Sequence, residues 1–165
     1  MSNNQRLNMT VPLEVGIGCR DMATMRQFYE QTLGLSFVSE ARVPAQTAQN
    51  YHLASGMVTV VRLQTPYGER IKLVAPDDAP ALPQSQPVNV FDRLNTSYLT
   101  FIITDIHAVT ARVLAGGGVS MSGDTPILSR PGLYVVFLRD PEGNVVELVQ
   151  YDDYDSYRPD LKKTA

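Results

Sequence analysis

Short runs of apolar residues, many alternating with polar ones, recur along most of the chain and predict strands. Such runs occur at residues 12–21, 35–43, 57–65, 70–75, 97–105, 133–140 and 145–150. Shorter apolar stretches at residues 119–123 and 126–129 flank a loop. Turn residues separate the strands, as in "PYGE" and "PEGN", because Pro, Gly and Asn each suit turn geometry.

Two segments have the spacing of an amphipathic helix instead. In residues 22–34 apolar side chains recur every three or four positions, with Asp21 as the expected N-cap and Gly34 as the expected C-cap. Residues 106–118 form the second predicted helix and end on glycines. Residues 44–56 are expected to be a loop.

The order strand, helix, three strands therefore occurs twice, which indicates an internal repeat. A shift of 84 residues places Asp21 on Asp105, and a shift of 75 residues later in each half places Gly68 on Gly143. The matched positions are caps and turns, so the repeat is structural. One such module leaves a bare sheet face that needs a partner, and two modules would supply it for each other.

The predicted fold class is α+β, with two tandem βαβββ modules in one chain. The expected organisation is a flexible N-terminus at 1–11, a first module at 12–75, a Pro-rich linker or lid at 76–96, a second module at 97–151 and a tail at 152–165. The tail carries no recognisable motif and would either pack over the site or fray.

The composition of the chain argues against two classes of binding partner. The 165-residue chain has a net charge of −3 and no block of Lys or Arg, which argues against nucleic acid and anionic membranes as partners. No apolar run reaches the roughly 18 residues of a membrane span, and the N-terminus lacks a signal peptide's apolar centre. Its single cysteine, Cys19, excludes an intrachain disulfide and is expected to be a buried, inert thiol, so a cytoplasmic location is expected.

Three longer stretches carry a family resemblance. They are "VGIGCRDMATMRQFYEQTLGLSFV", "FIITDIHAVTARVLAGGGV" and "YVVFLRDPEGNVVELVQ". They resemble the vicinal oxygen chelate superfamily, which includes glyoxalase I, extradiol dioxygenases, methylmalonyl-CoA epimerases and bleomycin-resistance proteins. The resemblance covers residues 12–151 and implies paired modules that form a half-open cup of mixed sheet, in a homodimer.

The resemblance also implies four positions that hold a metal in metal-dependent members, on the first and fourth strand of each module. Here they are Glu14, Lys72, Tyr98 and Glu147, where relatives usually have His, Glu or Gln. An ammonium has no lone pair and repels a cation, and a neutral tyrosine is a poor ligand. We therefore expect no metal cofactor; if a divalent metal (Ni, Zn, Mn, Mg or Fe) is bound, Glu14 and Glu147 are the expected ligands.

Two functions fit these four residues. The first is a protein of the bleomycin-resistance type that binds a small organic molecule in the cup between the modules. The second is a lyase or isomerase resembling glyoxalase I or the epimerases. There Glu147 would act as general base next to a carbonyl, and Lys72 would stabilise the resulting oxyanion. A structural Lys72–Glu147 ion pair, left from a former metal site, is the alternative to both.

The remaining candidates are ligand-binding residues. Glu14 and Tyr98 would line the cup, although Glu14 also fits an exposed strand residue and Tyr98 a core aromatic. Arg62 and Phe137 occupy equivalent third-strand positions, and Arg62 would either bind a carboxylate or lie along the sheet with its head in water. His52 lies in a long loop that could reach a ligand. With only two histidines, the chain does not fit an extradiol dioxygenase.

Overall fold

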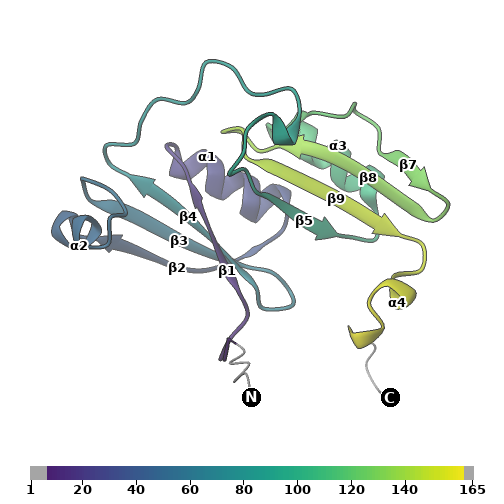
Figure 1. Cartoon of the computed structure of the whole chain (residues 1–165), viewed down its shortest axis with the longest axis horizontal. Helices are drawn as coiled ribbons and strands as arrows, with labels where there is room; N and C mark the ends of the chain where they lie inside the picture. Colours follow the sequence, from purple (N-terminus) through teal and green to yellow (C-terminus); the bar gives the residue numbers. More distant parts are fainter. Residues whose placement is uncertain (1–6, 162–165) are drawn as a thin grey trace, which may run out of the picture. The chain divides into compact units, whose positions relative to one another are not determined.

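The computed structural model describes residues 7–161 and shows two compact units (Figure 1). Unit 1 comprises Met1–Met22 and Leu35–Ala79, and unit 2 comprises Ala23–Gly34 and Pro80–Ala165. The helical segment of the first predicted module therefore groups with the second sheet. Residues 1–6 of the predicted flexible N-terminus lie outside the described residues. We describe each unit by itself.

Unit 1 is built on a four-stranded mixed sheet. Its strands are β1 (Glu14–Gly18), β2 (Ser36–Val43), β3 (Val58–Gln64) and β4 (Arg70–Pro76), in the order β1-β4-β3-β2. β1 runs parallel to β4, and the other neighbours are antiparallel. The predicted turn between β3 and β4 places Gly68 at a φ of +100°, a conformation that glycine adopts without steric cost.

Buried and partly exposed side chains alternate along β3 and β4, so one face of this sheet is apolar and the other is polar. Leu63 and Leu73 are fully buried on one face, whereas Arg62 and Lys72 lie half-buried on the other. Side chains of a strand point alternately to opposite faces, so the polar residues gather on one side. Cys19, just beyond β1, is buried as predicted.

A short helix, α2 (Ala45–Asn50), lies within the predicted loop 44–56, so the loop prediction is wrong there. Ala48 of α2 is fully buried against Val58 and Val60 of β3. Six residues are too few to produce a recognisable helical period, because a helix this short is stabilised by packing rather than by propensity.

Unit 2 contains a five-stranded mixed sheet. Its strands are β5 (Tyr98–Ile102), β6 (Val119–Ser120), β7 (Ile127–Arg130), β8 (Leu133–Arg139) and β9 (Val145–Tyr151). The order is β5-β9-β8-β6, with β7 also paired to β8 and β5 parallel to β9. The predicted α+β class, with mixed sheets and few helices, is confirmed.

Two helical segments accompany this sheet. The helix α3 (Ile106–Ala115) lies against β8 and β9 (Figure 1), and its N-cap Asp105 accepts a hydrogen bond from the backbone N–H of Ala108 at 3.1 Å. The other begins as α1 (Met22–Gln27) and continues as a π-helical turn, η1 (Phe28–Thr32). The predicted helix at 22–34 is thus present, followed by Gly34 at a φ of +81°.

Strand register confirms the internal repeat. Glu14 lies opposite Arg70 in the parallel pair of unit 1, and Tyr98 lies opposite Val145 in that of unit 2. These are the partners that the shifts of 84 and 75 residues require. No helix among the described residues is long and apolar enough to cross a membrane.

The Pro-rich segment and the tail contain short helical turns. They are η2 (Val90–Asp92), α4 (Tyr154–Tyr157) and η3 (Pro159–Leu161). The ring of Tyr157 stacks on that of Tyr151, with centroids 4.1 Å apart, so the start of the tail packs on the end of β9.

The turn between β8 and β9 is organised by a buried carboxylate. Asp140 accepts hydrogen bonds from the backbone N–H groups of Glu142 and Asn144, from Nδ2 of Asn144, and at 3.0 Å from the hydroxyl of Tyr29. Both Asp140 and Tyr29 are almost fully buried. Burial raises the pKa of the Asp140 carboxyl, and these hydrogen bonds oppose that shift. The turn therefore also anchors η1.

Replacing Tyr29 by Phe is expected to lower the free energy of unfolding by about 1.5 to 3 kcal/mol, because a buried carboxylate would lose a donor. The loss should be largest above the raised pKa of Asp140, where the carboxylate is ionised, and smaller in acid, where the carboxyl is protonated. Urea denaturation at several pH values measures this. Tyr67→Phe, at an exposed tyrosine, is the control. An equal loss at every pH would contradict the Tyr29–Asp140 hydrogen bond.

Candidate functional site

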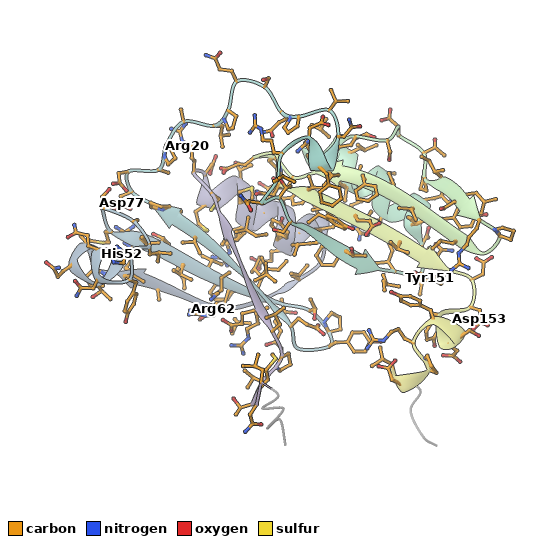
Figure 2. The ribbon with its side chains drawn as sticks, viewed as in Figure 1. Arg20, His52, Arg62, Asp77, Tyr151 and Asp153 are labelled. Atoms are coloured by element: carbon orange, nitrogen blue, oxygen red, sulfur yellow. The ribbon has the colours of Figure 1, made fainter. Side chains whose placement is uncertain are left out.

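Three cations surround one carboxylate on the polar face of unit 1. Oε2 of Glu14 lies 3.8 Å from Nε of Arg62 and 3.7 Å from Nζ of Lys72, and Oε1 lies 3.4 Å from Nη1 of Arg70. We call Arg62, Arg70 and Lys72 with Glu14 the cationic cluster; Arg62 is labelled in Figure 2. Each cation is about one-third exposed, so its free N–H groups remain accessible.

The strand register explains why these side chains meet. Arg62 lies directly opposite Lys72 in the β3–β4 pair, and Glu14 lies opposite Arg70 in the β1–β4 pair. Arg70 also donates from Nε to Oε1 of Gln64 at 2.9 Å, which fixes the orientation of its guanidinium. All of these residues come from neighbouring strands and one face of the sheet.

The composition of the cluster is not explained by stability. Like charges placed directly across a sheet, as Arg62 and Lys72 are, destabilise the pair. Partly exposed ion pairs such as those with Glu14 contribute little. Three cations against one carboxylate leave a local excess of positive charge that an anion would neutralise.

Aromatic rings occupy the corresponding face of unit 2. The Tyr98 ring packs edge-on against Phe137, with centroids 5.5 Å apart, and against Phe91, with centroids 6.1 Å apart. Glu147 lies opposite Phe137 in the β8–β9 pair, and its Oε2 accepts a hydrogen bond from Oγ1 of Thr100 at 2.5 Å. Among the described residues, Glu147 forms no ion pair.

An open pocket lies in unit 2 beside these rings. Its volume is about 460 Å³, and it is lined by Val88, Asn89, Val90, Phe91, Asp92, Met121, Ser122 and Phe137. One wall comes from the Pro-rich segment that the sequence predicted to be a linker or lid. The other comes from β8 and the residues after β6.

The predicted site residues thus fall into two groups. Glu14, Arg62 and Lys72 meet in unit 1, whereas Tyr98 and Phe137 meet in unit 2, and Glu147 is the register partner of Phe137.

The two histidines belong to neither group. His52 is exposed in the turn after α2, at a φ of +53°, and its backbone N–H donates to Gln49 (labelled in Figure 2). The His107 ring packs against Tyr134.

Sequence reasoning missed Arg70 and Thr100. Arg70 lies two residues before Lys72, so the period of two along a strand places both on one face and would have identified it. The same period along β5 links Thr100 to Tyr98. Phe91, in the Pro-rich segment, had no such signal, because its position depends on tertiary packing.

Comparison with known proteins identifies the family. The family model of the glyoxalase/bleomycin resistance protein/dioxygenase superfamily matches residues 7–148. The chain belongs to this superfamily. The family resemblance inferred from the sequence is therefore confirmed. No curated protein sequence is significantly similar to the chain.

Solved structures share the fold. A glyoxalase family protein from Bacillus cereus superposes with a TM-score of 0.73 at 22% identity, covering 92% of this chain and 98% of that one. A glyoxalase family protein from Enterococcus faecalis gives a TM-score of 0.59 at 20% identity, covering 82% and 94%. A family enzyme from Burkholderia phytofirmans PsJN gives 0.54 at 17%, covering 84% and 96%. At these identities the similarity establishes the glyoxalase-like fold alone.

Three of the four residues at the metal positions implied by the family resemblance are unsuited to a divalent cation. In unit 1, Glu14 is already shared by three cations, and Lys72 offers no lone pair. In unit 2, Tyr98 packs between two phenylalanine rings. Within residues 7–161, no group of three or more His, Cys, Asp or Glu side chains could hold a metal ion.

Substituting Lys72 by Glu should create a cation site, because position 72 is one of the metal positions that the family resemblance implies. A second carboxylate beside Glu14 replaces a repelling charge, so Mn²⁺ affinity is expected to rise by about tenfold or more. Calorimetric titration of wild type and Lys72→Glu measures this. Lys72→Gln is the matched control, because it removes the charge without adding a ligand. Wild-type protein that binds Mn²⁺ as tightly as Lys72→Glu would contradict the argument.

Proposed function

We propose that this superfamily member binds a small organic anion on the polar face of unit 1, where Lys72 replaces a metal ligand of the metal-dependent members. The observation that carries the proposal is the cationic cluster, in which Arg62, Arg70 and Lys72 share one carboxylate. A half-exposed excess of positive charge is electrostatically unfavourable in the free protein. A carboxylate or phosphate group would relieve it.

Each member of the cluster has a distinct part in this proposal. Arg62 presents a planar guanidinium that can hold two oxygens of one anionic group, and Lys72 adds a compact positive charge directly across the strand pair. Arg70 is oriented by Gln64 and Glu14. Glu14 spaces the cations and can accept a hydrogen bond from a hydroxyl or amide of the ligand.

The size of the cluster favours a ligand with one localised anionic group over a long polyanion. The net charge of the chain is −3, and the three cations lie on one face of a single sheet. A polyanion needs an extended basic surface. A small carboxylate or phosphonate needs only two or three converging donors, which the cluster supplies.

Titration calorimetry with benzoate, succinate and phenylphosphonate, at constant ionic strength, tests the proposal. We expect binding of at least one of these anions by the wild type, weakened about 10- to 100-fold in Lys72→Gln and in Arg62→Gln because a charge-assisted hydrogen bond is removed.

Arg42→Gln is the matched control for the anion titration. Arg42 belongs to the same sheet but pairs with Asp77, away from the cluster, so its substitution should leave anion affinity unchanged. Equal weakening in all three variants would indicate a non-specific charge effect and sink the proposal. So would the absence of binding to every anion by wild-type protein.

A lyase or isomerase activity of the glyoxalase I or epimerase type is the second candidate. It is favoured by one observation: Glu147 is oriented by Thr100 and, among the described residues, has no cationic partner. A carboxylate held in this way can accept a proton from a carbon next to a carbonyl. Glu14, with three cations around it, is far less suited to that role.

Proton exchange separates the enzyme from the binding protein. In D₂O, an enzyme of this type should exchange the α-proton of the hemithioacetal formed from methylglyoxal and glutathione, and Glu147→Gln should abolish the exchange. Thr100→Val should slow it and leave the carboxylate in place. Exchange that persists at the wild-type rate in Glu147→Gln would exclude Glu147 as the base.

The expected homodimer and cytoplasmic location stay predictions, based on the family resemblance and the composition.

A further inference from the structure

A buried arginine holds part of the Pro-rich segment against the sheet of unit 2. Arg139, at the end of β8, is only 9% exposed. Its Nη2 donates to the backbone oxygen of Pro87 at 2.8 Å, and its Nη1 donates to that of Gly143 at 2.8 Å. We call residues 86–92 the strap. A charged side chain buried to bind two carbonyl groups fixes the strap in one place.

The strap is also ordered by its own contacts. The Asp92 carboxylate accepts hydrogen bonds from the backbone N–H and the side-chain amide of Asn89, at 2.9 Å and 3.0 Å, which closes the turn of η2. Gln86 packs so closely over Gly143 that a Cβ atom there would lie 2.4 Å from its Nε2. The strap is thus anchored at Gln86 and Pro87 and ordered internally by the turn at Asn89–Asp92.

The fixed strap keeps apolar side chains open to water. Phe91 is 66% exposed and Val88 is 83% exposed, although both line the pocket next to Phe137. Leaving such side chains in water forgoes the free energy of burial that a collapsed loop would gain. Exposed apolar side chains that line a concave surface mark ligand or partner sites.

The two phenylalanine rings of the pocket wall share an aromatic neighbour, Tyr98. Tyr98 packs edge-on against both Phe91 of the strap and Phe137 of β8. The pocket of about 460 Å³ lies within the range of small-molecule sites. Two phenylalanines and Met121 on its walls suit a flat aromatic group, because aromatic rings and thioethers both contact rings favourably.

The charge on the pocket wall itself is negative. Among the described residues that line it, Asp92 alone is charged, and its hydrogen bonds with Asn89 hold its pKa below the usual range. Glu147 lies opposite Phe137 on β9 and adds a second carboxylate. Arg139 is turned toward two backbone carbonyls, and Arg93, which follows Asp92 in the chain, is not among the lining residues. An anionic ligand would therefore be repelled here, in contrast to the cationic cluster.

We propose that the pocket beneath the strap is a separate binding site for an uncharged or cationic aromatic group. Phe91 and Phe137 contact the ring of the ligand, and Asp92 attracts a positive charge on it. Every residue that lines the site belongs to unit 2, so no residue of the cationic cluster forms part of its wall.

Three probes with the same double ring test the charge preference: 1-methylquinolinium, 1-naphthol and naphthalene-1-sulfonate. The readout is the methyl NMR signal of protein labelled with ¹³C-methionine, because Met121 lines the pocket, whereas Met25 is buried in α1 and Met57 lies in unit 1. We expect the first two probes to shift the Met121 signal at lower concentration than the sulfonate does, with Met57 unchanged.

Variants link that signal to the strap. Phe91→Ala should weaken 1-methylquinolinium binding about tenfold. Tyr51→Ala, which removes an exposed ring from unit 1, should leave it unchanged. Asp92→Asn should reduce the advantage of the cationic over the neutral probe. An unchanged Met25 signal verifies folding. The proposal fails if no probe shifts Met121, if the sulfonate binds most tightly, or if Phe91→Ala binds like the wild type.

Discussion

The parallel pairing of the first and last strand in each repeat is the constraint on which this protein depends. Parallel neighbours cannot be joined by a tight turn, so the chain must leave β1, form a helix and two strands, and return as β4 beside it. The pairing fixes which side chains share a face. It places Glu14 opposite Arg70 and, through the β3–β4 hairpin, brings Arg62 and Lys72 to the same carboxylate.

The same constraint in the second repeat holds different chemistry. The positions equivalent to Arg62 and Lys72 are Phe137 and Glu147, which are also direct strand partners. The same strand pairing therefore carries a cationic face in unit 1 and an aromatic, acidic face in unit 2. The fold is that of the superfamily, and the chemistry of these positions belongs to this chain. A functional claim must accordingly rest on these side chains rather than on the fold.

The local sequence pattern was sufficient to predict most of the fold. Alternating apolar and polar residues located the strands, and the recurring turn and cap residues indicated the internal repeat. Both signals lie within a few residues of sequence. The helix α2 and the Tyr29–Asp140 hydrogen bond were not predictable in this way. Each depends on residues brought together by tertiary packing, 111 positions apart in the case of Tyr29 and Asp140.

The candidate site was predicted only in part, for the same reason. The residues at the superfamily's metal positions followed from the resemblance, but their neighbours did not. Whether Lys72 faces a carboxylate or a second cation depends on strand register, and it faces both, in Glu14 and Arg62. The position of the strap could not be predicted either, because it depends on the hydrogen bond from Arg139 to Pro87. In the sequence, Arg139 is simply a polar residue at the end of a predicted strand.

The central claim is that the cationic cluster, which includes Lys72 at one of the metal positions implied by the family resemblance, binds an anion. Anomalous diffraction from crystals soaked with both selenate and Mn²⁺ tests it most directly, because each ion is identified by its own absorption edge. The account predicts a selenium peak within hydrogen-bond distance of Lys72 and Arg62 and no manganese peak at Glu14 or Glu147. A manganese ion bound by either glutamate, with no selenate at the cationic cluster, would contradict it.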